Sequence, residues 1–169
     1  GDLQRVMSNV KTRGILGEIQ LGTILEDILT PEQYVRNAYV DPSSREVVEF
    51  AVKLPGQGSD NEPVLLPIDS KFPMEDYQRL QLANEQAGHI APQAIENAGK
   101  QFENAVRKAA KDISTKYLKP PKTTDFGLLF VPTEGLYAEI LARPGLFESL
   151  RQEFKVVAVG PSTVSAFLS

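Results

Sequence analysis

The 169-residue sequence contains no cysteine, no tryptophan and a single histidine, His89. The absence of cysteine excludes disulfides and thiolate metal sites. A metal ion in this protein would have oxygen ligands, which favours Mg²⁺, Mn²⁺ or Ca²⁺ over Zn²⁺. His89 lies in a polar stretch between two expected helices, where a solvent-exposed loop histidine is a simpler interpretation than a catalytic one.

Long apolar runs are also missing. No stretch approaches the roughly 20 apolar residues that cross a bilayer, and no signal-peptide pattern opens the chain, so we expect no membrane contact here. Hydrophobic residues make up 41% and charged residues 24%, as in ordinary folded domains. The length suits one domain, residues 1–169, and the abrupt start in a helical pattern suggests a fragment of a longer chain.

The net charge is −4, which argues against a generally cationic surface for nucleic acid. Basic residues are nevertheless concentrated in one segment, where seven of them stand against only Glu103 and Asp112, a local balance of +5. A solvated helix face and a phosphate-binding patch both fit this segment. The seven are Lys100, Arg107, Lys108, Lys111, Lys116, Lys119 and Lys122.

Hydrophobic periodicity predicts an α/β fold around one mixed sheet. The first helix is expected from Asp2 to Leu29, and Gly14 and Gly17 on its apolar stripe would let another backbone come close. Strands are expected at 34–40, 47–54, 63–71, 126–131 and 156–159, and further helices at 74–88, 92–117, 134–141, 145–154 and after 160–163.

The segments 47–54 and 63–71 alternate in polarity and are joined by turn-forming residues, which predicts an antiparallel hairpin. Asp69 and Lys71 are two residues apart, so their side chains would leave the same face of the strand. Glu49 lies on the neighbouring strand and would join them if the register places it beside Asp69. Two carboxylates and an ammonium suit phosphodiester hydrolysis, in which a divalent ion is held by the carboxylates. A structural salt bridge is the alternative for the same residues.

Six short blocks resemble the RmuC family, in order and at suitable spacing from about Asn9 to Leu168. The resemblance implies a restriction-endonuclease-like core, a central mixed β-sheet flanked by α-helices, and the chemistry of Mg²⁺- or Mn²⁺-dependent PD-(D/E)xK nucleases. It also implies a role in limiting DNA rearrangement, and a longer chain on the cytoplasmic side with a membrane anchor and a coiled coil. The blocks are Asn9–Gly14, Gly17–Leu21, Pro67–Lys71, Thr123–Phe126, Val131–Gly135 and Gly160–Thr163.

By position, the resemblance assigns Asp69 and Lys71 to the acid and the lysine of the (D/E)xK half. Glu49 stands where relatives carry aspartate, and a glutamate reaches further by one methylene. Glu18 matches the acidic residue that such nucleases contribute from the first helix, although a solvated glutamate also fits. Metal binding is thus expected from Asp69, Glu49 and the Ser70 carbonyl, and catalysis from Lys71, Asp69, Glu49 and Glu18.

DNA is the expected partner, and a homo-oligomer is an open possibility. Gln20 is a further candidate on the first helix, whereas Thr133 and the block Gly160–Thr163 are explained by helix capping, and Thr123–Asp125 by a turn. The expected DNA contacts are Lys11, Arg13, Lys108, Lys111, Lys116, Lys119 and Lys122.

Two other functions compete with a nuclease. A scaffold that binds DNA structures without cutting them would use the same fold, and the glutamate at position 49 favours it. A glycosidase with a carboxylate pair is the second, but the lack of tryptophan leaves little aromatic surface for sugars.

Overall fold

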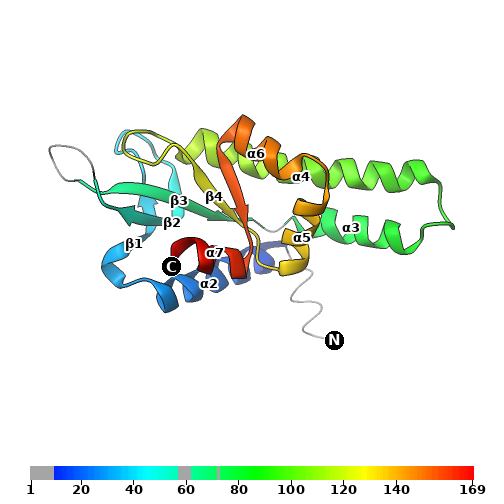
Figure 1. Ribbon diagram of the computed structural model, residues 1–169, viewed down its shortest axis with the longest axis horizontal. Coiled ribbons are helices and arrows are strands. Elements are labelled where there is room, and N and C mark those ends of the chain that lie inside the picture. The colour runs from blue at the N-terminus through cyan, green and yellow to red at the C-terminus, as the bar shows by residue number, and fades with distance from the viewer. Residues whose placement is uncertain (1–9, 57–61, 72) are drawn as a thin grey trace.

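A five-stranded mixed sheet forms the centre of the protein (Figure 1). The computed structural model describes residues 10–56, 62–71 and 73–169, with the backbone alone for 10–15. In spatial order the strands are β1 (Tyr34–Tyr39), β2 (Val47–Leu54), β3 (Val64–Ser70), β4 (Gly127–Phe130) and β5 (Val156–Val159). The first three strands pair antiparallel, whereas β3, β4 and β5 run parallel, so the carboxyl ends of these last three meet at one edge.

Helices cover both faces of the sheet (Figure 1). One face packs against α2 and α7, and the other against α4 and α6, which gives two separate clusters of buried side chains. Strand β4 is buried on both sides: Leu128 and Phe130 belong to the α2 cluster, and Leu129 belongs to the α4 cluster. The helices are α2 (Val10–Ile28), α3 (Met74–Glu85), α4 (Pro92–Tyr117), α5 (Glu134–Ala142), α6 (Leu146–Phe154) and α7 (Pro161–Leu168), with a 3-10 turn at Pro31–Gln33.

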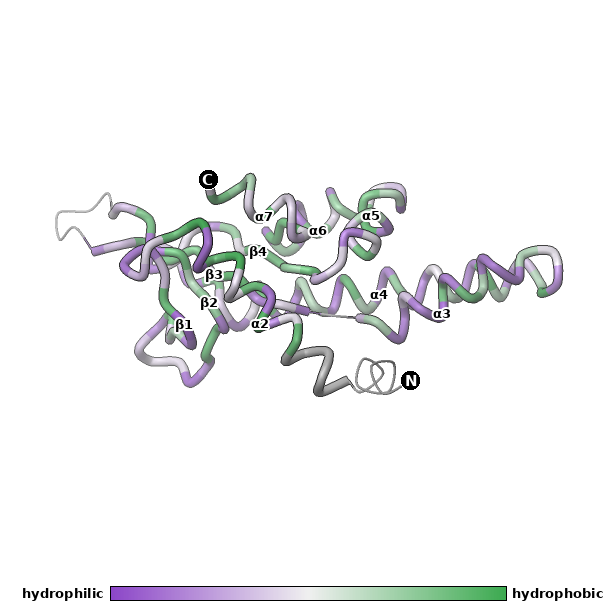
Figure 2. Tube along the Cα trace, turned by 90° about the horizontal axis from the view of Figure 1, so that it is seen from below, coloured by the Kyte–Doolittle hydropathy of each residue, from purple (hydrophilic) through white to green (hydrophobic). Residues whose placement is uncertain are grey.

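Helices α3 and α4 form a hairpin that projects beyond the sheet (Figures 1 and 2). The 26 residues of α4 span about 39 Å. Its buried side chains recur at helical spacing, from Phe102 through Val106 and Ile113 to Tyr117. The outer part of this stripe meets α3, and the inner part covers the sheet at β4 and β5.

The observed elements confirm the expected ones in type and order, and confirm a mixed α/β sheet flanked by helices. The expected helix from Asp2 is described only from Val10, because residues 1–9 lie outside the described part. The helix expected to reach Gly88 ends at Glu85, since Gly88 has a φ of +93° that continues no helix. Within residues 10–56, 62–71 and 73–169, no helix combines the length and the apolar character that crossing a membrane requires.

Candidate active site

The register of the β2–β3 hairpin brings the two sequence-predicted carboxylates together. Phe50 pairs with Ile68 and Ala51 with Pro67, so the next step of the same register sets Glu49 opposite Asp69. Both side chains leave the face that α4 covers, because Ala51 and Leu129 on that face belong to the α4 cluster. Asp69 is 3% exposed, and Glu49 is partly buried. The Ser70 N–H donates to Glu49 Oε2 at 3.1 Å, which fixes the orientation of that carboxyl group.

Lys71 stands where the buried pair meets solvent. Its Nζ lies 3.3 Å from Asp69 Oδ2, and its side chain is 39% exposed against 4% for that of Asp69. The Lys71 N–H donates to the Phe130 carbonyl at 3.0 Å, which extends the β3–β4 ladder by one residue and keeps Lys71 on the face of Asp69. Asp69 Oδ2 is fully buried, and the Lys71 ammonium forms an ion pair with it.

Burial dominates the electrostatics of both carboxyl groups. It raises the pKa of Glu49 to about 8, with the charge of Asp69 acting in the same direction and the Ser70 N–H opposing it. Burial also raises the pKa of Asp69, while Lys71 and then Lys116 oppose the rise. Tyr117 has a pKa of about 12, raised first by burial and next by the charge of Asp69. Burial, more than any neighbouring charge, therefore sets the protonation of these groups.

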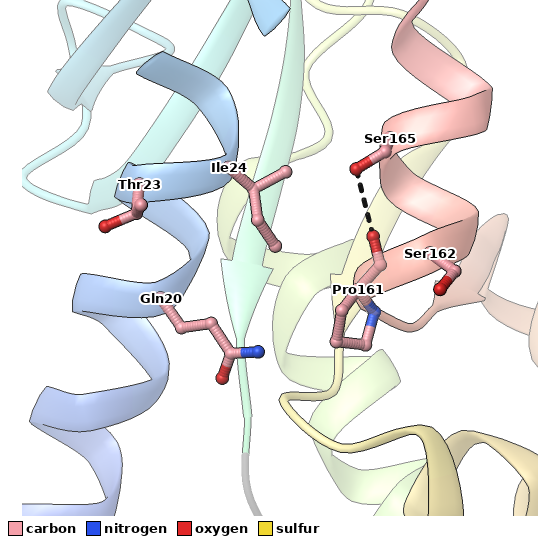
Figure 3. Close-up of a pocket in the computed structure, with 6 residues that line it drawn as sticks. All are labelled: Gln20, Thr23, Ile24, Pro161, Ser162 and Ser165. Atoms are coloured by element: carbon pink, nitrogen blue, oxygen red, sulfur yellow. Dashed lines mark hydrogen bonds between the residues drawn. The ribbon is translucent and has the colours of Figure 1, made fainter. Parts of the chain in front are cut away.

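Glu18 and Gln20 differ in their relation to this site. The negative charge of Glu18 makes a minor contribution to the raised pKa of both Glu49 and Asp69, well behind burial. Gln20 lies on another side of α2, where it faces α7 (Figure 3). Sequence spacing alone did not separate these two residues.

A groove of about 590 Å³ separates α2 from α7 (Figure 3). None of its lining side chains is ionisable, so the groove offers no general acid, general base or anionic metal ligand. The lining residues are Gln20, Thr23, Ile24, Pro161, Ser162 and Ser165.

The comparisons with known proteins cover the whole chain. The model of the RmuC family matches residues 1–169. This chain belongs to the RmuC family. Two curated relatives, each named "DNA recombination protein RmuC homolog", come from Xylella fastidiosa strains Temecula1 and 9a5c, and each is 52% identical over all 169 residues. The chain spans 36% of the length of each relative, and no solved structure matches it.

In this RmuC-family chain, the remaining sequence blocks have structural partners. Thr133 Oγ1 accepts from the Leu136 N–H at 3.0 Å, which confirms a cap on α5. The Gly160 N–H donates to Thr163 Oγ1 at 2.8 Å at the start of α7. Thr123 is buried and accepts from the Lys119 N–H at 2.8 Å, which holds the turn before β4. Capping and turn formation thus account for all three blocks.

Three of the expected DNA contacts of this RmuC-family chain, Lys108, Lys111 and Lys116, do not share one face of α4. Lys108 and Lys111 are exposed on α4, whereas Lys116 lies five residues beyond Lys111, about 140° around the helix, on the side nearer Asp69. Lys119 and Lys122 follow the helix, with the Lys119 ammonium donating to the Thr115 carbonyl at 3.2 Å and the Lys122 ammonium 3.4 Å from Asp41. The side chains of Lys11 and Arg13 lie outside the described residues, and His89 is an exposed turn residue.

Metal ligands in this RmuC-family chain are few. In the described part of the sequence, no group of three or more His, Cys, Asp or Glu side chains is arranged to hold a metal ion. The available side-chain donors are the oxygens of Glu49 and Asp69. A divalent ion with this pair would need main-chain, water or substrate oxygens as its other ligands.

Proposed function

We propose that this chain is the nuclease domain of an RmuC-family DNA recombination protein, with a restriction-endonuclease-like core that hydrolyses phosphodiesters with Mg²⁺ or Mn²⁺. The relatives' printed names support the role in recombination. The observation that carries the proposal is the buried Glu49–Asp69 pair on adjacent strands, with Lys71 3.3 Å from Asp69 at the solvent boundary. A mixed sheet with helices on both faces supports the core.

The donor set suits a hard divalent cation. Mg²⁺ in proteins is commonly held by one or two carboxylates, with water and phosphate oxygens completing its octahedron. Asp69 Oδ2 is buried and faces the Lys71 ammonium at 3.3 Å, so a bound metal ion would be a second cationic partner of this carboxylate. Burial, and next the charge of Asp69, raise the pKa of Glu49 to about 8, and a bound cation would favour the ionised carboxylate and lower that pKa. Asp69, Glu49 and the Ser70 carbonyl are the proposed ligands, and the bound ion would polarise the scissile phosphate and lower the pKa of a water molecule.

Each neighbouring group has its own proposed task. Lys71 is partly exposed beside Asp69, so its ammonium can orient the attacking water or stabilise negative charge on the phosphate. The Ser70 N–H holds the Glu49 carboxyl toward β3, which offsets the extra methylene of a glutamate at this position. Glu18 adds negative charge from α2 and thereby strengthens cation binding by the pair.

The DNA backbone is proposed to approach along α4. Lys116 is the basic residue of this helix whose charge acts on Asp69, so it is the proposed contact of α4 to a phosphate at the site. Lys108, Lys111, Lys119 and Lys122 would act as longer-range electrostatic contacts, and their effect should weaken as salt rises.

The test is cleavage of labelled linear, branched and single-stranded DNA by the purified chain with Mg²⁺, with Mn²⁺ and with EDTA. Asp69→Asn and Lys71→Ala are compared with Asp125→Asn and Lys53→Ala, which change an exposed aspartate and an exposed lysine. Cleavage that requires metal and is lost only in the first two variants is the expected result. Binding without cleavage on every substrate would overturn the nuclease proposal and favour a DNA-binding scaffold.

A further inference from the structure

Helix α2 lies unusually close to the carboxyl edge of the parallel strands. A Cβ atom built on Gly17 would be 2.8 Å from Ser70 Oγ and 2.9 Å from Pro132 Cγ, closer than real Cβ atoms come to such neighbours. Ser70 ends β3, and Pro132 follows β4 by two residues. Both side chains are buried, so neither the Ser70 hydroxyl nor the proline ring has free space to move into. A side chain at position 17 would therefore displace the helix.

Local helix propensity does not favour glycine at this position. Glycine inside a helix costs about 1 kcal/mol relative to alanine. Position 17 lies well inside α2, which begins at Val10 and ends at Ile28. The close contact with Ser70 and Pro132, and not the helix itself, is what requires the missing Cβ.

We propose that Gly17 is a positioning residue for the acidic site: its lack of a side chain lets α2 rest on Ser70 and Pro132, and this contact sets the position of Glu18 relative to the strand end that carries Asp69. Glu18 is the next residue of α2, and Ser70 is the next residue after Asp69, so the contact couples the two acidic segments directly. The catalytic consequence rests on the proposed nuclease function, whereas the geometric consequence does not.

A second glycine of α2 provides a matched control. A Cβ on Gly22 would be 3.0 Å from Arg36 Nη1 and 3.3 Å from Phe50 Cζ. The Arg36 atom is the far end of a side chain that is 47% exposed, and a small rotation moves it away. The Phe50 ring would have to give by only a few tenths of an ångström, so Gly22→Ala adds the same methyl group to the same helix against milder contacts than those at Gly17.

The functional test compares Gly17→Ala, Gly22→Ala, Glu18→Gln and the double variant Gly17→Ala/Glu18→Gln. The readout is the Mg²⁺ concentration that gives half-maximal cleavage. Mutation of a residue that orients metal ligands typically lowers metal affinity 10–100-fold. We expect Gly17→Ala and Glu18→Gln each to raise the half-saturating Mg²⁺ concentration about 10-fold. The double variant should raise it no further than either single variant does. Gly22→Ala should stay within about twofold of the wild-type concentration. An unchanged half-saturation in Gly17→Ala, or effects that multiply in the double variant, would overturn the inference.

Rescue and structure separate positioning from general damage. Adding Ser70→Ala and Pro132→Ala to Gly17→Ala removes the two atoms that the new methyl group meets. The reference for this triple variant is the double variant Ser70→Ala/Pro132→Ala. The half-saturating Mg²⁺ concentration of the triple variant should return toward that of this reference. Crystal structures of metal-free Gly17→Ala and Gly22→Ala give a readout without activity. Glu18 should move away from Glu49 only in Gly17→Ala. If the wild-type chain cuts no DNA, the nuclease proposal fails, and these structures still decide the inference: an unmoved Glu18 refutes it.

Discussion

The pKa of Glu49 predicts that the metal-free protein loses stability as pH rises. In the unfolded chain this carboxyl ionises near its ordinary pKa of 4.5, whereas burial keeps it protonated to about pH 8 in the folded protein. Between these values the unfolded state binds fewer protons than the folded state, so the free energy of unfolding falls with increasing pH. Replacement by glutamine keeps the size of the side chain and removes the titration.

The expected magnitude follows from the two pKa values. Each pKa unit corresponds to about 1.4 kcal/mol, so the interval between 4.5 and about 8 corresponds to roughly 5 kcal/mol. Water reaches part of the Glu49 side chain and screens its charge, so the expected loss is about 3–5 kcal/mol. Whole domains are stable by only about 5–15 kcal/mol, which makes this loss easy to measure. Asp69, whose pKa is also raised by burial, adds to the fall.

The assay is urea denaturation in EDTA at pH 5 and pH 8 for the wild type, Glu49→Gln and Glu46→Gln, the last changing an exposed glutamate just before β2. Glu49→Gln should remove about 3–5 kcal/mol of the pH dependence, and Glu46→Gln should retain it. Mg²⁺ should restore wild-type stability at pH 8 and have little effect at pH 5, because binding requires the ionised carboxyl groups. Equal losses in the wild type and Glu49→Gln would refute the reasoning.

Three further predictions concern single side chains. Ser70→Ala should leave the free energy of unfolding unchanged or raise it by up to about 1 kcal/mol, because Ser70 Oγ is buried without a hydrogen bond; a loss above about 2 kcal/mol by urea denaturation would contradict this. Thr133→Ala should cost about 1 kcal/mol by removing the cap of α5, whereas Thr23→Ala on exposed α2 surface serves as the control. Lys116→Ala should weaken DNA binding and reduce the slope of log K against log salt concentration by about 1. Lys100→Ala, at the far end of the basic segment, should change this slope less. Equal slopes in the two variants would show that Lys116 does not contact the DNA backbone.

The sequence by itself determined most of the secondary structure, because its signals are local. Proline limits α4 at Pro92 and after Tyr117, and both predicted bounds are those observed. Alternating polarity predicted the β2–β3 hairpin and the shared face of Asp69 and Lys71, since side chains two apart on a strand point the same way. The resemblance to the RmuC family was likewise readable from short blocks, and the match over residues 1–169 confirms it.

Only the tertiary structure decided how these pieces meet. Polarity fixed which face Glu49 occupies, but its pairing with Asp69 depended on a register that the turn between the strands left open. Glu18 and Gln20 are two residues apart on α2, yet one acts on the carboxyl pair and the other lines the α7 groove, because helix packing decides which side of a helix meets which neighbour. The unusual approach at Gly17 depends on Ser70 and Pro132, residues 53 and 115 positions away, and no local pattern carries contacts between residues so far apart in the chain.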